Sequence, residues 1–189
     1  MTSRAESAAA TRRALLEAAS GLLDEGGPGA VTLREVGARA GVSRGAPYGH
    51  FADKDELLAV LAIESWIAVT AQLRALRQDE SREPRSRLRG ALRVILDLAR
   101  GRPALYALMF VAPSREPGAL IEAAAEAQDE FLAIVGDVVG EDGARPRGAL
   151  LMSSAHGLAS MELSGQLDRS KWGATSDELL ELLVDVMGR

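Results

Sequence analysis

The sequence predicts an all-α protein, and three observations support this prediction. Alanine and leucine dominate a composition that is 47% hydrophobic but only 4% aromatic, which favours helices over strands. Apolar residues recur with helical spacing along most of the 189 residues. Prolines also stand where helix boundaries are needed. We expect about nine helices: an N-terminal three-helix helix-turn-helix domain, followed by a larger helical domain.

The bulk composition excludes several classes of protein. Cysteine is absent, so disulfides, thiolate zinc sites and a cysteine nucleophile are excluded, and we expect neither a metal nor a cofactor. The net charge of −5 argues against general nucleic-acid binding but allows a local DNA-binding patch. The N-terminus lacks the apolar run of a secretion signal, and no apolar stretch reaches the roughly 18 residues of a membrane span. We therefore expect a soluble cytoplasmic protein.

The first helix is predicted from Thr11 onward. Residues 1–10 are small and polar without periodicity, and we interpret them as a flexible arm. The glycine-rich segment 26–29 ends the helix. One apolar face of the helix is formed by Leu15, Ala19, Leu22 and Leu23.

The second helix is short and has signals at both ends. Thr32 is placed to cap it, and Glu35, three residues later, completes a capping box. Val36 and Ala40 are expected to face inward. Gly41 is expected to end the helix in the left-handed conformation.

A third short helix is predicted from about Ser43 to Phe51. Pro47 lacks an N–H group, so we expect the helix to begin at Arg44 or its first turn to be distorted. Phe51 should turn inward and lock the helix against the others.

A long fourth helix follows over residues 54–77, capped by Asp53. The domain boundaries are accordingly 1–10 for the arm, 11–56 for the helix-turn-helix domain and 57–189 for the second domain. The inner face of the long helix comprises Leu58, Ala62, Trp66, Val69, Leu73 and Leu76. Beyond a charged connector at 78–86, further helices are expected at about 86–100, 103–111, 117–139, 146–167 and 175–187.

The segment around the third helix has side chains suited to DNA. A recognition helix presents its first turn to base edges, and Gly45 and Ala46 keep that turn slim. Ser43 and Arg44 supply donors for phosphates or guanine edges. Further phosphate contacts are expected from Tyr48, His50, Lys54 at the start of the next helix, and Thr32.

The stretch VTLREVGARAGVSRGAPYGHFADKDELL strongly resembles the DNA-binding domain of the TetR family. The shared core is Val42, Ser43, Tyr48, His50, Phe51, Lys54 and Leu57. The resemblance covers about residues 11–58 and implies a homodimeric all-α transcriptional regulator, usually a repressor, whose C-terminal domain binds a small molecule. Pro47 and Gly49 stand where many members carry an apolar residue and an arginine, so the resemblance implies no particular base preference.

Arg4, Arg12 and Arg13 allow two interpretations. Basic N-terminal arms can enter a minor groove, whereas most such arginines are simply solvated, and we favour the second alternative.

The second domain contains candidates for a ligand pocket. Segments 104–112 and 131–139 are apolar on more than one face, as expected of buried or cavity-lining helices. His156-Gly157 also resembles the Trp-x-x-x-His-Gly signature of one TetR-family C-terminal class, with Met152 in place of tryptophan. Each candidate alone is compatible with simple core packing, and His156 with a structural role. The predicted pocket residues are Trp66, Tyr106, Met109, Phe110, Phe131, Met152 and His156.

A stripe of small residues along 146–167 predicts close helix packing. We interpret it as a homodimer interface completed by the last helix, although packing within one chain uses the same chemistry. The predicted interface residues are Ser153, Gly157, Ser160, Ser164, Leu179, Leu183 and Val186.

An enzyme is the competing class of protein, and the sequence gives it little support. His50 and His156 are far apart, no HExxH arrangement occurs, and no phosphate-binding glycine loop follows a strand. We therefore expect a dimeric ligand-responsive regulator that binds a palindromic operator on double-stranded DNA and is released by a small, largely apolar effector. The alternative is a helix-turn-helix regulator whose C-terminal domain binds a partner protein and no small molecule.

Overall fold

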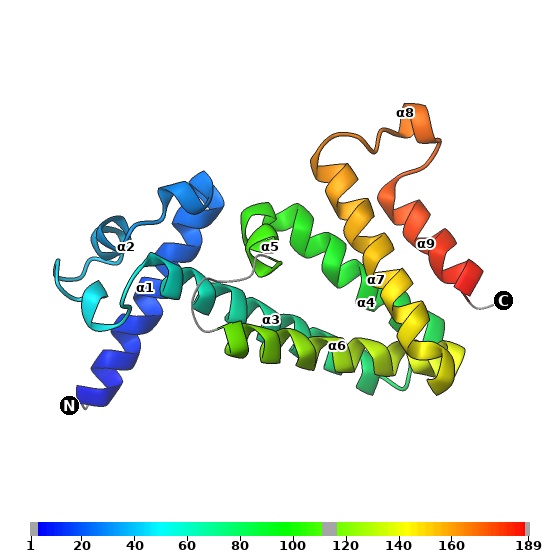
Figure 1. Ribbon diagram of the computed structural model, residues 1–189, viewed down its shortest axis with the longest axis horizontal. Coiled ribbons are helices and arrows are strands. Elements are labelled where there is room, and N and C mark those ends of the chain that lie inside the picture. Colours follow the sequence, from blue (N-terminus) through cyan, green and yellow to red (C-terminus); the bar gives the residue numbers. More distant parts are fainter. Residues whose placement is uncertain (1–3, 111–116, 188–189) are drawn as a thin grey trace. The chain divides into compact units, whose positions relative to one another are not determined.

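The computed structural model describes residues 4–110 and 117–187, and within these ranges the regular elements are helices (Figure 1). This confirms the all-α prediction. The helices are α1 (Arg4–Ala30), α2 (Leu33–Arg39), α3 (Lys54–Gln78), α4 (Pro84–Gly101), α5 (Pro103–Met109), α6 (Pro117–Val139), α7 (Glu141–Leu163), α8 (Arg169–Trp172) and α9 (Ser176–Met187), with a short 3-10 helix, η1 (Pro47–Gly49).

The chain forms two compact units. The first contains Met1–Ser65 and Ala104–Ile121, and the second contains Trp66–Pro103 and Glu122–Arg189. Helices α3 and α6 each contribute residues to both units. Helix α5 belongs to the first unit from Ala104 onward.

The core of the first unit is built from α1, α2, α3 and α5. The predicted inward face of α1 is confirmed, because Leu15, Ala19 and Leu23 are fully buried. Phe51 is buried with them, and Leu105 of α5 belongs to the same cluster. Apolar burial of this kind contributes most of the free energy that holds a small helical unit together.

Helix α1 begins earlier than the sequence analysis predicts. Residues 4–10, interpreted there as a flexible arm, are helical, and the Thr11 hydroxyl donates to the Ser7 carbonyl at 3.0 Å. Residues 5–10 are exposed, so they lack the apolar periodicity that signals a buried helix. Their alanines have high helix propensity and extend the helix without burial. At the other end, Gly27 (φ 66°) breaks the helix inside the predicted glycine-rich segment.

In the second unit, α7 and α9 both pack on α4 and on each other (Figure 1). The buried face of α4 consists of Leu88, Ala91, Leu92, Ile95, Leu96 and Ala99. On α7, a Cβ atom at Gly148 would lie 2.5 Å from Leu132 Cδ2, so α6 approaches α7 closely at this glycine. The predicted apolar face of α3 is also confirmed for Trp66, Val69 and Leu73.

Two features of the second unit differ from the sequence prediction. Helix α7 begins at Glu141, not at Pro146, and Pro146 lies inside it. The proline lies in the second turn on the exposed side of the helix, where its ring is tolerated at the cost of one backbone hydrogen bond. The four-residue helix α8 was not predicted, because a single turn has no apolar periodicity.

Helix α3 is long and apolar enough, by length and composition, to cross a membrane. The sequence analysis found no such stretch. Leu57, Leu61 and Leu73 are among the α3 side chains buried inside the protein, and this burial accounts for the apolar character of the helix.

Candidate DNA-binding site

Thr32 and Gly41 cap helix α2 as predicted, but the predicted capping box differs, because the Glu35 carboxylate accepts from the Thr32 hydroxyl and not from the Thr32 backbone N–H. The Glu35 N–H donates to the Thr32 hydroxyl oxygen at 3.1 Å, and that hydroxyl donates to Glu35 Oε2 at 2.8 Å. Arg34 and Thr32 together lower the pKa of the Glu35 carboxyl by hydrogen bonding to it. Gly41 follows the helix with φ 68°, which confirms the left-handed end.

The predicted third helix is replaced by a series of tight turns that includes η1. The Ala46 N–H donates to the Ser43 carbonyl at 2.9 Å, and the Gly49 N–H donates to the Ala46 carbonyl at 3.1 Å. Because Pro47 has no N–H group, the Ser43 carbonyl cannot accept an α-helical bond from position 47. The distortion predicted from Pro47 is therefore confirmed, and an α-helix over 43–51 is not formed.

Helix α2 and η1 approach each other very closely at one point. Gly37 and Pro47 are both buried, and a Cβ atom at Gly37 would lie 2.7 Å from Pro47 Cγ. Sequence analysis missed this contact, although a glycine in the middle of a short helix is a signal of close packing. The contact fixes the position of the turn relative to α2.

The end of the turn is fixed from α1 by Arg12. Its guanidinium lies over the Phe51 ring, 4.6 Å from the centroid, and Nη1 donates to the His50 carbonyl at 3.3 Å. Phe51 itself is 1% exposed, which confirms the inward orientation predicted for it. Arg12 therefore stabilises the domain, a role that neither alternative for the N-terminal arginines anticipated. Arg13 is exposed.

Lys54 lies at the first position of α3 and donates its ammonium group to the Pro28 carbonyl. This bond links the start of α3 to the glycine-rich segment at the end of α1. Asp53 accepts from the Glu56 N–H at 2.9 Å, which confirms the predicted cap. An ammonium group has three donors, so Lys54 has donors left for a phosphate.

Among the predicted DNA-contact residues, Thr32, Ser43, Arg44, Gly45 and Tyr48 are exposed, whereas Ala46, His50 and Lys54 are half-buried. Tyr48 is the most prominent, since 61% of it is exposed. Its neighbours Pro47 and Phe51 are buried, so the backbone on both sides of Tyr48 is held by packed side chains.

The predicted pocket residues are divided between the two units. Tyr106, Met109 and Phe110 belong to the first unit, where the Tyr106 and Phe110 rings have centroids 5.0 Å apart. Burial raises the pKa of Tyr106 to about 12, so its hydroxyl stays protonated as a hydrogen-bond donor. The residues of the second unit are Trp66 and Phe131, which are buried, and Met152 and His156, which are half-buried.

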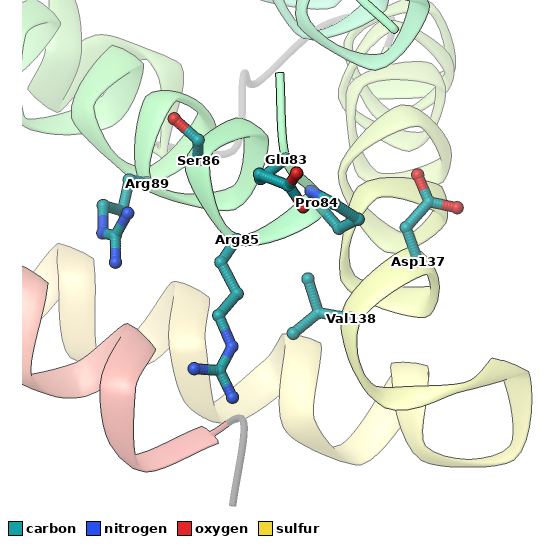
Figure 2. A pocket seen from close by; sticks show the side chains of 7 residues that line it. All are labelled: Glu83, Pro84, Arg85, Ser86, Arg89, Asp137 and Val138. Atoms are coloured by element: carbon teal, nitrogen blue, oxygen red, sulfur yellow. The ribbon is translucent and has the colours of Figure 1, made fainter. Parts of the chain in front are cut away.

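A surface pocket of about 460 Å³ lies elsewhere in the second unit (Figure 2). It is formed where the start of α4 faces the end of α6, and none of the predicted pocket residues lines it. Its lining is Glu83, Pro84, Arg85, Ser86, Arg89, Asp137 and Val138. Opposite charges on its two sides give it no net preference for an anion or a cation.

The residues predicted for the dimer interface lie at or near the surface. Ser153, Ser160, Ser164 and Val186 are exposed, and Gly157, Leu179 and Leu183 are half-buried. Among the described residues, a Cβ atom at Gly157 would meet no neighbouring atom within 4 Å, so this glycine serves no close contact there. Large apolar side chains are exposed on the same two helices, namely Leu150, Leu163, Leu182 and Val186.

Comparison with known proteins identifies the family. The family model described as bacterial regulatory proteins of the tetR family matches residues 15–61. The model described as a tetracyclin repressor-like C-terminal domain matches residues 88–187, which is more than half of the chain. The chain belongs to the TetR family of transcriptional regulators. It is a DNA-binding transcription factor with a helix-turn-helix domain and not an enzyme.

Solved structures agree with this assignment. A protein of unknown function from Rhodococcus sp. RHA1 is 28% identical, with a TM-score of 0.81 over 95% of this chain and 94% of that one. A TetR regulator from Streptomyces coelicolor is 20% identical, with a TM-score of 0.67 over 93% and 94%. The complex of SmeT with triclosan is 21% identical, with a TM-score of 0.59 over 94% and 90%. For the last two, which are 21% or less identical to this chain, the similarity shows a common fold alone.

Proposed function

We propose that this TetR-family protein is a homodimeric repressor that binds a palindromic operator and is released by a small, largely apolar molecule. The observation that carries the proposal is the turn of residues 43–49, which exposes Ser43, Arg44, Gly45 and Tyr48. Pro47 packs against Gly37, and Arg12 binds the His50 carbonyl just after the turn. A rigid support lowers the entropy lost when the turn binds DNA.

The contact residues divide into two roles. Tyr48 and Lys54 bind phosphates, together with Thr32 and His50, and set the register on the duplex. Ser43 and Arg44 lie where the turn begins, with the slim Gly45 and Ala46 beside them, and contact base edges. Phosphate contacts carry no sequence information, whereas an arginine on a guanine edge does.

Two copies would associate through α7 and α9. The open space at Gly157 favours a partner chain over packing within one chain as the role of the small-residue stripe. Exposed Leu182 and Val186 supply apolar area beside it. The DNA-binding domains of the dimer would then lie about one turn of DNA apart, roughly 34 Å, to match two half-sites.

The effector would act through α5 and α3. Leu105 of α5 is part of the core around Phe51, so an effector that contacts Tyr106 and Met109 on the same helix acts on the DNA-binding unit directly. Helix α3 connects Lys54 to Trp66 by a continuous backbone. The effector would bind more tightly to the conformation that has low affinity for DNA. The coupling free energy between the effector site and the DNA site is typically about 1–3 kcal/mol, and it releases the DNA. The triclosan complex of SmeT is a precedent for a small apolar ligand on this fold.

One observation favours a second candidate function. Trp66, Tyr106, Met109 and Phe131 are all nearly fully buried, as side chains of a filled core would be. In that case the C-terminal domain binds a partner protein in place of a small molecule. A thermal-shift screen with small apolar compounds on wild type and Tyr106→Ala distinguishes the two, since only an effector site gives a shift that the substitution abolishes.

The DNA-binding roles are tested by selection of bound fragments from random genomic DNA. We expect wild type and Tyr48→Phe to select the same sequence, with Tyr48→Phe weaker on every fragment, and Arg44→Ala to select a relaxed sequence. A changed preference in Tyr48→Phe contradicts these roles. Such a regulator acts on the chromosome, in the cytoplasm of a bacterial cell.

A further inference from the structure

Arg100 joins three helices of the second unit at one point. It lies in the last turn of α4, and its Nε and Nη2 donate to the two carboxylate oxygens of Glu162 on α7 at 2.8 and 3.1 Å. Nη2 also donates to Asp177 Oδ2 at 2.7 Å and to the Ser176 hydroxyl at 2.6 Å, both in the first turn of α9. The guanidinium thus binds the end of α7 and the beginning of α9 together.

The residues around Arg100 form a closed network. Ser176 is 3% exposed, accepts from Arg100 and donates its own hydroxyl to Glu162. Asp97, one turn earlier on α4, lies 3.5 Å from Arg100 Nη1 and adds another carboxylate. Hydrogen bonds to Glu162 and Asp177 hold Arg100 in the charged form, and Arg100 in turn lowers the pKa of Glu162.

Helix α9 is held partly by apolar side chains and partly by ion pairs. Its buried residues are Ser176, Leu180 and Val184. Leu179 and Leu183 are half-buried. Ion pairs add to these contacts on α4: Arg93 donates to Glu181 at 2.8 Å, and Arg89 pairs with Glu181 and Asp185. Arginines of α4 therefore face carboxylates along most of the length of α9, and Arg100 is the one that also binds α7.

We propose that Arg100 is a positioning residue that sets the geometry of α7 and α9 for homodimer formation. The inference rests on the dimer in the proposed function, and it goes beyond that proposal by naming the group on which the interface depends. Arg100 itself does not contact the second chain. In the proposed dimer it keeps α7, which carries Gly157, and α9, which carries the exposed Leu182 and Val186, in a fixed relative position.

Only arginine satisfies this arrangement. Glu162, Asp177 and the Ser176 hydroxyl surround one planar guanidinium, which donates from three nitrogens in fixed directions. A lysine ammonium keeps the charge but presents a single nitrogen. Arg100→Lys therefore tests geometry separately from charge.

The arrangement has a consequence for the effect of salt. An apolar interface alone is not weakened by NaCl, whereas partly exposed ion pairs are screened. The side chains of Arg100 and Glu162 are each 31% exposed, and that of Asp177 is 45% exposed. The dimer is therefore expected to weaken when NaCl is raised from about 0.1 to about 1 M, where the Debye length falls to roughly 3 Å.

The experiment is analytical ultracentrifugation of the full-length protein, with hydrogen exchange of the α9 amides measured in parallel. Arg100→Gln and Arg100→Lys are compared with wild type and with Arg74→Gln, a control that removes the Arg74–Glu130 pair (2.8 Å) between α3 and α6. We expect the dimer dissociation constant to rise about tenfold or more in both Arg100 variants and to stay within about twofold in the control. Asp177→Asn is the second variant if the Arg100 variants do not fold.

The outcomes separate this proposal from the dimer itself. If wild type dimerises and the Arg100 variants dimerise equally well at every salt concentration, the positioning role of Arg100 is wrong. If wild type remains monomeric at all concentrations, the dimer in the proposed function fails instead. In that case, the hydrogen-exchange rates test whether Arg100 positions α9 within one chain. Faster exchange of the α9 amides in Arg100→Gln supports this role, and unchanged exchange overturns it.

Discussion

The first unit and the group formed by α4, α7 and α9 are stabilised in different ways. Around Phe51 the first unit is closed by apolar side chains, and Arg12 and Lys54 bind backbone carbonyls, which have no charge to lose. Helix α9 is attached to α4 by arginine–carboxylate pairs beside two buried apolar residues. Contacts of the first kind are insensitive to salt and acid, whereas those of the second kind respond to both. The contacts that hold the DNA-binding turn around Phe51 are thus of the kind that varies least with conditions.

Removal of the Phe51 side chain, which tests the apolar core of the first unit, is expected to lower the stability of the protein most. Phe51→Ala leaves a cavity and removes the ring under Arg12, which should lower the free energy of unfolding by about 3–5 kcal/mol. Urea unfolding followed by circular dichroism measures the change. Tyr48→Ala, at an aromatic residue that is 61% exposed, is the control and should change stability by at most about 0.5 kcal/mol. Similar losses in both variants would contradict the roles assigned to the two rings.

The close contact between α2 and η1 should give the next largest effect. Gly37→Ala places a methyl group against the Pro47 ring, and the forced shift is expected to cost about 1–3 kcal/mol and to weaken DNA binding. Gly45→Ala is a matched control for stability alone, because a Cβ atom there meets nothing within 4 Å, whereas Gly45 itself belongs to the proposed DNA-binding turn. Thermal unfolding and binding to a fixed DNA fragment measure both quantities. If Gly37→Ala changed neither the stability nor the DNA binding, the turn would not be fixed by α2.

Substitution of Gly157 by alanine is expected to have a smaller effect, which stabilises the folded chain but weakens its association into a dimer. Alanine has a better helix propensity and space for its methyl group, so Gly157→Ala should stabilise the isolated chain by about 0.5–1 kcal/mol. In the proposed interface the same methyl group separates the two helices and raises the dimer dissociation constant. Unfolding at low protein concentration and sedimentation at high concentration separate the effects. Stabilisation without weaker association would place Gly157 outside the interface.

Acid should affect the second unit through its paired carboxylates, and this is the smallest of the expected effects. Hydrogen bonding to Arg100 lowers the pKa of Glu162 below the ordinary value of 4.5, and Arg77 does the same for Glu130. A depressed folded-state pKa gives stability that is complete above pH 4.5 and is lost as the pH falls through the folded-state value. Urea unfolding at several pH values should show this loss in wild type and a shallower dependence in Arg100→Gln. An equal pH dependence of the unfolding free energy in wild type and Arg100→Gln would contradict the effect of Arg100 on the Glu162 carboxyl.

Local rules predicted much of the DNA-binding domain. The caps at Thr32 and Asp53, the left-handed Gly41 and the distortion at Pro47 each depend on neighbours within a few residues, and the structure confirms them. The length of α1 was underestimated, because exposed alanines form helix without an apolar pattern. Contacts between residues distant in sequence, such as that of Arg12 with Phe51, left no periodic signal.

The second domain was less predictable for the same reason. The Arg100 network joins residues 62 to 77 positions apart, and no spacing rule connects them. Pro146 suggested a helix start, but its place on the exposed side lets α7 continue through it. Small residues at Gly148 and Gly157 look alike in the sequence. Only the structure shows that the first contacts Leu132 and that the second faces open space.

The most direct test of the central claim is fluorescence anisotropy on the promoter region beside the protein's own gene, measured at several salt concentrations. We expect tight, salt-dependent binding by wild type, loss of binding in Tyr48→Ala, and unchanged binding in Trp172→Ala, a substitution of an exposed aromatic residue on α8 in the second unit. If wild type fails to bind this DNA, selection from random genomic fragments in the presence of candidate effectors extends the same test. Failure there, or equal losses in the two variants, would contradict DNA binding through the 43–49 turn.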